Sequence, residues 1–247
     1  MNYSLRFVSK KYSLILADKN YYLWYRNGAL YLSHNIDGSD MSLLGGLCKS
    51  NVNYSLDSLR YRIICKSKAL QRILRFQPRS CIRIENGRYL FSFNRNIYEV
   101  NYDGRIKLVH SIRKGMANPL SICTIKDISG FKDCIAYGEY GWNENRDPIN
   151  IVRCINGVWD AVYTFPKNSI CHIHALIPDK REACVYVLTG DKDNESGIWK
   201  ATNDFRCIVP VLYGKQSYRS CAAFIDEKLM VYATDTPLEG NFLYETD

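Results

Sequence analysis

Acidic residues recur at equivalent positions in three similar segments of the chain, where they are suited to chemistry on sugars. Each segment is an apolar run that ends in an acidic loop, and the acids are Glu139, Asp191 and Asp235. Glycoside hydrolysis needs two carboxyl groups roughly 5–10 Å apart, one of them as the general acid. We therefore take the three as candidate catalytic residues, with Glu139 and Asp191 as the first pair.

Other polar and aromatic residues gather around the same loops. Carboxylates and amides hydrogen-bond to hydroxyls, Arg binds acidic sugars through paired hydrogen bonds, and aromatic rings stack on pyranose rings. The candidate substrate-binding residues are Tyr137, Arg146, His172, His174, Asp193, Glu195, Gln216, Arg219 and Glu239. An acid at the end of a strand also often caps a turn, so each residue has a structural interpretation beside the functional one.

His172 and His174 alternate along one predicted strand, so their side chains share a face. With Asp191 or Glu139 nearby they could bind a metal ion, or they could line the interior and hydrogen-bond. We favour hydrogen bonding and predict neither a metal nor a cofactor. The ten cysteines form no CxxC pair, which disfavours a structural zinc site and favours buried free thiols.

The elements that must position these residues are strands. The segments repeat about every 40–50 residues and contain only strand and turn patterns, which is typical of the blades of a β-propeller. We predict an all-β chain, one domain over residues 1–247, with four to five readable blades of four strands. The clearest blades span 79–114, 121–165, 171–213 and 218–247, and the last is incomplete.

Turns near the predicted blade ends resemble the Asp box of sialidase-like, or BNR-repeat, propellers. They include Asp37-Gly38, Asp103-Gly104, Asn156-Gly157 and Asn203-Asp204. Residues 110–245 are also similar to bacterial proteins of this class, often labelled glycosyl hydrolase, that are linked to surface polysaccharides. The matching segments include Asn118-Pro-Leu, Tyr137-Gly-Glu-Tyr, His172-Ile-His174, Thr189 to Trp199, and Gln216-Ser-Tyr-Arg219.

This resemblance implies a sialidase-like propeller and fixes which loops share a face. If the Asp-box turns join strands three and four, the acidic loops lie on the opposite face, where they form an acidic funnel over the channel. Sialidases pair a Tyr nucleophile with a Glu, which makes Tyr218 a further catalytic candidate. The family's N-terminal Arg-Ile-Pro motif is absent, and a third Arg cannot be assigned, so sialidase activity itself is not expected.

Residues 57–76 are predicted as one basic helical insertion. Its apolar stripe is Leu59, Ile63, Leu70, Ile73 and Leu74, which we expect to pack on the propeller. Lys and Arg are frequent over residues 60–83 and acids are lacking, so a protein partner could dock there. Aromatic residues are too sparse there for base stacking, and nucleic acid is not expected.

The chain carries no run of about 18 apolar residues and no apolar signal core, so we predict no transmembrane segment and a cytoplasmic location. The predicted function is recognition, and possible cleavage, of a bacterial surface glycan that could be acidic. The alternative is a non-catalytic interaction scaffold that docks a partner through its basic segment. Whether the protein is an enzyme stays open at this point.

Overall fold

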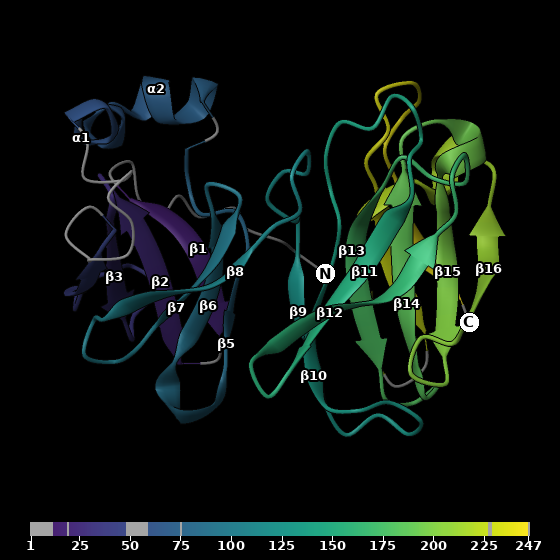
Figure 1. Ribbon diagram of the computed structural model, residues 1–247, viewed down its shortest axis with the longest axis horizontal. Coiled ribbons are helices and arrows are strands. Elements are labelled where there is room, and N and C mark those ends of the chain that lie inside the picture. Colours follow the sequence, from purple (N-terminus) through teal and green to yellow (C-terminus); the bar gives the residue numbers. More distant parts are fainter. Residues whose placement is uncertain (1–11, 19, 48–58, 75, 227–228, 247) are drawn as a thin grey trace. The chain divides into compact units, whose positions relative to one another are not determined.

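The computed structural model describes residues 12–18, 20–47, 59–74, 76–226 and 229–246. They form antiparallel sheets and a few short helices, which confirms the predicted all-β class. The chain divides into two compact units, Met1–Ser111 (unit 1) and Ile112–Asp247 (unit 2), as coloured along the sequence in Figure 1. The beginning of the predicted helical insertion, at residues 57 and 58, lies outside the described residues.

Unit 1 contains two four-stranded sheets whose strands follow one another in chain order. The first sheet consists of β1 (Ser13–Asp18), β2 (Tyr21–Arg26), β3 (Ala29–Ser33) and β4 (Ser42–Gly46). The second consists of β5 (Cys81–Arg83), β6 (Tyr89–Phe93), β7 (Asn96–Val100) and β8 (Ile106–Ser111), with the turn η1 (Glu85–Gly87) before β6. Strand β6 is buried throughout, because Phe91 and Phe93 stack or pack against Tyr98 of the next strand.

The predicted helical insertion forms two short helices, α1 (Leu59–Lys66) and α2 (Lys68–Ile73). They separate at Ser67, whose hydroxyl caps α2 by accepting a hydrogen bond from the Leu70 amide. This break corrects the prediction of one apolar stripe on the buried face. Ile64 and Cys65 enter the core instead, while the predicted core residues Ile63, Leu70, Ile73 and Leu74 are exposed. Within the described parts of the chain, no helix has the length and apolarity to cross a membrane.

Unit 2 contains three sheets. The first consists of β9 (Ile122–Ile125), β10 (Cys134–Gly138), β11 (Ile149–Ile155) and β12 (Val158–Phe165). The second consists of β13 (His172–Asp179), β14 (Cys184–Gly190), β15 (Gly197–Thr202) and β16 (Cys207–Tyr213). The last sheet has three described strands, β17 (Ser220–Ile225), β18 (Met230–Thr234) and β19 (Leu243–Thr246), in line with the predicted incomplete blade.

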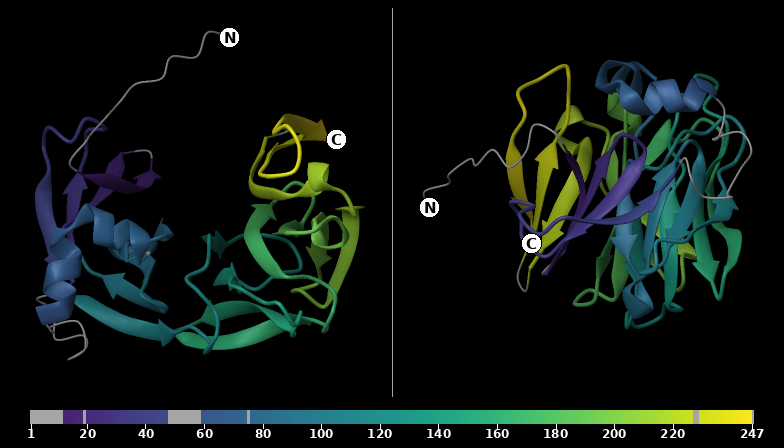
Figure 2. Two further views of the ribbon diagram at one scale, coloured as in Figure 1. Left: turned by 90° about the horizontal axis from the view of Figure 1, so that it is seen from above. Right: turned by 90° about the vertical axis from the view of Figure 1, so that its left-hand side faces the viewer.

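The sheets of unit 2 pack face to face, in the order in which they occur in the chain. Strand β13 packs against β9 and β10 of the preceding sheet and against β17 of the following one, and Figure 2 shows this sequence from teal to yellow. Strand β14 is buried throughout because β-branched and aromatic residues fill both of its faces, whereas the last strand, β16, is largely exposed. In each sheet of unit 2 the last strand is the least buried.

The turns that resemble Asp boxes join the third and fourth strands of their sheets. Asn156 and Gly157 both have positive φ angles, which suits the tight turn between β11 and β12. In the β15–β16 turn, Asp204 accepts hydrogen bonds from Arg153 Nη1 at 2.8 Å and from the Lys132 amide at 3.3 Å. This acid ties its own sheet to the preceding one. Every described cysteine is a free thiol.

Candidate functional site

A cluster of polar side chains lies where β13, β14 and β17 meet in unit 2. Asp191, the first residue after β14, places its Oδ1 atom 3.4 Å from His172 Nε2 and 3.8 Å from His174 Nε2. Arg219 Nη2 donates to the same oxygen at 3.1 Å. The two histidine Nε2 atoms are 3.0 Å apart. We call His172, His174, Asp191 and Arg219 the Asp191 cluster.

Backbone carbonyl groups hold both imidazole rings from their other side. His172 Nδ1 lies 2.9 Å from the Gly141 carbonyl oxygen, and His174 Nδ1 lies 2.8 Å from that of Ser220. A carbonyl oxygen only accepts hydrogen bonds, so both Nδ1 atoms carry hydrogen. The Nε2 atom of either ring, when neutral, is then an acceptor that faces Asp191.

Burial and hydrogen bonding oppose each other in the titration of the two histidines. Burial, the largest single effect, lowers the pKa of His172, but the hydrogen bonds and charge interactions with Asp191 and Cys171 together outweigh it and raise this pKa to about 9. For His174 burial prevails, and the pKa lies below its usual value. Hydrogen bonds from His172 and His174 in turn hold the pKa of Asp191 well below the usual range. Besides the hydrogens on Nδ1, one proton is therefore held between the two Nε2 atoms, and the neighbouring Asp191 carboxylate is ionised.

The sequence creates this geometry through two bulges and a glycine. The pairing of β13 with β14 shifts between Ile173 and Ala175, so His174 lies at a β-bulge. The pairing of β17 with β18 shifts in the same way after Ser220, the residue whose carbonyl holds His174. Gly190 faces the ring directly, and a Cβ atom there would lie 2.5 Å from His174 Cε1. Only glycine leaves room for the imidazole.

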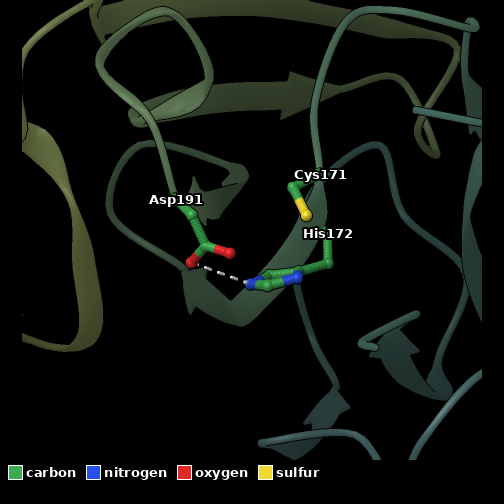
Figure 3. Close-up of side chains that lie close together, drawn as sticks. All are labelled: Cys171, His172 and Asp191. Atoms are coloured by element: carbon green, nitrogen blue, oxygen red, sulfur yellow. Dashed lines mark ion pairs between the residues drawn. The ribbon is translucent and has the colours of Figure 1, made fainter. Parts of the chain in front are cut away.

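Cys171 completes the surroundings of His172. Figure 3 shows its side chain beside those of His172 and Asp191, and the three ligand atoms lie within 4.8 Å of one another. On the other side, the ring of Tyr140 lies 4.4 Å from that of His172. In the cluster the two histidines are buried and Arg219 is partly buried, whereas the Asp191 side chain is 38% exposed. A ligand reaches the cluster most easily at this carboxylate.

Glu139, which we paired with Asp191 as a catalytic candidate, has a different environment. Its carboxylate is 1% exposed and accepts hydrogen bonds from Arg113 Nε at 2.7 Å and from Arg113 Nη2 at 2.6 Å. The Asn150 amide donates to it as well, at 2.8 Å. Tyr137, on the same strand, is also buried, and burial raises the pKa of its hydroxyl. Glu139 and Tyr137 are therefore buried residues that stabilise the interior of unit 2.

The loop after β14 is held by a second buried pair, near the short helical turn η2 (Asp193–Glu195). Arg146 Nε donates to Glu195 Oε1, and Glu195 Oε2 in turn accepts from the Asp191 amide at 3.5 Å. Gln216, in the turn η3 (Gln216–Tyr218), donates to Asp193 Oδ1 at 2.8 Å and to the Asp191 carbonyl at 3.0 Å. Arg146, Asp193, Glu195 and Gln216 thus hold the loop that presents Asp191.

The remaining predicted residues lie at the edge of the cluster or beyond it. Asp235 follows β18, is 62% exposed, and lies 3.9 Å from Arg219 Nη1. Tyr218 is half-buried in η3, one residue before Arg219, and Glu239 is exposed in the loop between β18 and β19. The structure brings His172, His174, Asp191, Arg219 and Asp235 together. The acidic loops are largely charge-balanced, because Arg113, Arg146 and Arg219 pair with their acids.

Two features of the site were not predicted. Arg113 precedes the repeat that contains Glu139, and no motif marks it as a partner of that residue. Trp142 follows Gly141 in the loop after β10, and its side chain is 81% exposed. The run Tyr140-Gly141-Trp142, two aromatic residues in a polar loop, is the sequence signal that would have identified Trp142.

Solved structures establish the fold class. The extracellular domain of BT4673, a proposed one-component system of B. thetaiotaomicron, is 12% identical with a TM-score of 0.60, and the match covers 98% of this chain and 28% of that one. YCF48 bound to D1 peptide is 11% identical with a TM-score of 0.57, over 94% of this chain and 62% of that one. The chain has a β-propeller fold. Its described residues form five blade-like sheets.

A third solved structure with a similar fold is that of a proposed enzyme. A proposed 6-phosphogluconolactonase from Bacteroides uniformis is 10% identical with a TM-score of 0.53, over 94% of this chain and 68% of that one. No protein-family model and no curated protein matches the sequence. At such identities the likeness concerns the fold alone, so function has to be argued from the site.

Proposed function

We propose that the protein binds a hydroxyl-rich glycan, such as a bacterial surface polysaccharide, at the loops around Asp191, and that it does not hydrolyse this glycan. The observation that carries the proposal is the exposure of Trp142 beside the cluster. Its indole is 81% exposed although the neighbouring Gly141 carbonyl is fixed against the buried His172. A large aromatic ring held in water on an ordered loop is typical of a binding surface.

The polar groups next to this loop support a sugar as the ligand. Asp191 and Asp235 both offer exposed carboxylate oxygens, which accept hydrogen bonds from hydroxyl groups. Stacking on an aromatic ring together with hydrogen bonds to hydroxyls would recognise a pyranose. The resemblance of residues 110–245 to sialidase-like proteins points to the same ligand class.

Binding without cleavage is favoured by the state of the carboxylates. A glycosidase needs one carboxyl group that is protonated and can donate to the leaving oxygen. Glu139 and Glu195 are buried in ion pairs with arginines, and the lowered pKa of Asp191 keeps that group ionised. These residues therefore lack the features of a general acid.

An array of anionic capsular and lipopolysaccharide glycans, probed with the folded full chain, tests the proposal. We expect binding that Trp142→Ala weakens at least about tenfold, while Tyr102→Ala, whose ring is 82% exposed in unit 1, leaves it unchanged. Release of reducing sugar should stay at background. No binding to any glycan overturns the proposal, and full retention of binding by Trp142→Ala refutes this site.

A second candidate function, docking of an acidic protein partner, is favoured by the surface of α1 and α2. Ile73 is 75% exposed, and Ile63 and Leu74 are about half exposed. The side chains of Lys66 and Arg72 are exposed on the same helices. Exposed apolar residues rimmed by basic ones are typical of a protein interface.

Polyglutamate is a simple probe of this surface. If the surface docks an acidic partner, polyglutamate should bind at low salt and dissociate as salt is added, because screening weakens charge pairing. The double substitution Lys66→Glu and Arg72→Glu should abolish binding, whereas Lys107→Glu, elsewhere in unit 1, should not. Equal loss in both variants would show only a nonspecific effect of net charge and would refute the docking surface.

A further inference from the structure

We propose that His172, His174 and Asp191 form a binding site for a divalent transition-metal ion, with zinc as the ion that the ligand set suits best. The site goes beyond glycan binding and does not depend on it. Two imidazole nitrogens and a carboxylate oxygen are ligands that zinc takes in proteins.

The orientation of the rings leaves three acceptor atoms facing one another. Because the Gly141 and Ser220 carbonyls fix hydrogen on both Nδ1 atoms, the neutral rings point their Nε2 lone pairs inward. The two Nε2 atoms are 3.0 Å apart and face the anionic Asp191. Acceptors in this arrangement repel one another unless a proton or a metal cation lies between them. A metal ion can serve all three at once.

The spacing of the ligand atoms matches a tetrahedral metal ion. Zinc bonds to nitrogen or oxygen are about 2.0–2.2 Å long, which places neighbouring tetrahedral ligands about 3.3–3.6 Å apart. The three distances here are 3.0 Å between the histidines, 3.4 Å from His172 to Asp191 and 3.8 Å from His174 to Asp191. Shifts of a few tenths of an ångström would give equal bonds.

The groups behind the ligands are those expected of a metal site. Histidine ligands usually donate their second N–H to a carbonyl or carboxylate, which fixes the ring and its tautomer. Both histidines do so here, and Arg219 steadies the carboxylate by donating to Asp191 Oδ1. That oxygen retains another lone pair for the metal. Gly190, which has no side chain, lets His174 approach.

Cys171 lies close to two of the three proposed ligands. Its Sγ atom is within 4.8 Å of the ligand atoms of His172 and Asp191, and zinc–sulfur bonds, at about 2.3 Å, are longer than bonds to nitrogen. A water molecule can complete the tetrahedron. The proposal needs only the other three ligands.

Titration of the full chain with Zn²⁺ alone tests the site. Protein treated with a chelator and then dialysed should bind one zinc ion per chain by calorimetry, in the absence of any glycan. Asp191→Asn should lower the affinity at least about tenfold, and His174→Gln should do the same. Asp147→Asn, which alters an exposed carboxylate of the same unit, should bind zinc like the wild type.

The visible absorption of bound Co²⁺ gives a second measurement of the site, which does not depend on differences in unfolding free energy between the folded variants. Co²⁺ bound to these ligands should give the strong visible absorption of a four-coordinate ion, and Asp191→Asn should lose it. Failure of the folded wild type to bind either ion overturns the proposal, as does unchanged zinc affinity in Asp191→Asn. If His174→Gln does not fold, the Asp191→Asn variant alone tests the site, because the Asp191 side chain is partly exposed. Glycan is absent throughout, so the metal site and glycan binding can fail independently.

Discussion

His172 and His174 direct their Nε2 atoms at each other across 3.0 Å, although both belong to one strand. Two side chains at i and i+2 of a regular strand share a face, and His174 itself lies at a β-bulge. The rings are held from behind by carbonyls of two neighbouring sheets. The geometry of the cluster therefore depends on how the three sheets of unit 2 pack against one another. Substitutions in these sheets can test it.

Gly190→Ala should damage the cluster. The added methyl group would lie 2.5 Å from His174 Cε1 and 3.1 Å from Arg219 Cγ, so the histidine ring must move. Overpacking of this kind costs about 1–3 kcal/mol of unfolding free energy, which urea denaturation measures. Zinc affinity should fall together with stability. If Gly190→Ala keeps the wild-type unfolding free energy and zinc affinity, the His174 ring has room to move.

Arg113→Met should destabilise the protein by leaving Glu139 as an unpaired, buried carboxylate. We expect a loss of about 1–3 kcal/mol, the cost of an unsatisfied buried polar group, because solvent can still reach the partly exposed position of Arg113. The double variant with Glu139→Gln should recover part of this loss in urea denaturation. If the single and double variants are equally stable, the pair contributes no coupling energy.

Asp204→Asn should show a pH-dependent loss of stability. Burial, the largest single effect, raises the pKa of Asp204, but the hydrogen bonds and charges of Arg153 and Lys132 together outweigh it and lower that pKa in the folded protein. An acid whose folded pKa is depressed stabilises the fold above its unfolded pKa of about 3.9, and the contribution is lost as pH falls through the folded value. The wild type should therefore exceed Asp204→Asn in unfolding free energy at pH 7.

The same difference should shrink below about pH 4, as urea denaturation at several pH values would show. Glu144→Gln, which alters an exposed acid of unit 2, serves as the control and should follow the wild type. A gap between wild type and Asp204→Asn that is constant with pH would contradict the assigned role of the Arg153–Asp204 pair.

Chelation of zinc should lower the thermal midpoint of the wild type. A ligand at 100 times its Kd adds about 2.7 kcal/mol to the unfolding free energy when it binds the folded state alone. Differential scanning calorimetry should show this shift with zinc, and a chelator should reverse it. Asp191→Asn should melt at the same temperature with and without zinc. An equal zinc shift in that variant would place the ion elsewhere.

Glu195→Gln should act on the cluster through the loop that holds Asp191. Glu195 accepts from Arg146 and from the Asp191 amide, so its charge positions the loop without contacting the histidines. We expect zinc affinity to fall by less than in Asp191→Asn, with an unchanged stoichiometry of one ion per chain by calorimetry. An effect as large as that of Asp191→Asn would mean that the loop itself is lost.

The sequence by itself determined the class of fold and the end of the sheets at which the acidic loops lie. Short continuous apolar runs, as in β14, indicate buried strands, and their spacing indicates blades, because both depend on local backbone geometry. The repeat also placed Asp191 and the histidines near one another. The sialidase-like family and the glycan stay predictions, because the solved structures bear on the fold alone.

Only the tertiary structure decided which of these residues contact one another. The spacing of the repeat could not reveal that Arg113 neutralises Glu139, that Ile73 is exposed, or that carbonyls of Gly141 and Ser220 fix the two rings. Such contacts depend on side-chain direction and on packing between sheets, where a shift of an ångström changes the partner. Asp191 and Glu139 occupy equivalent positions of the repeat, yet only Asp191 has an exposed carboxylate beside two histidines.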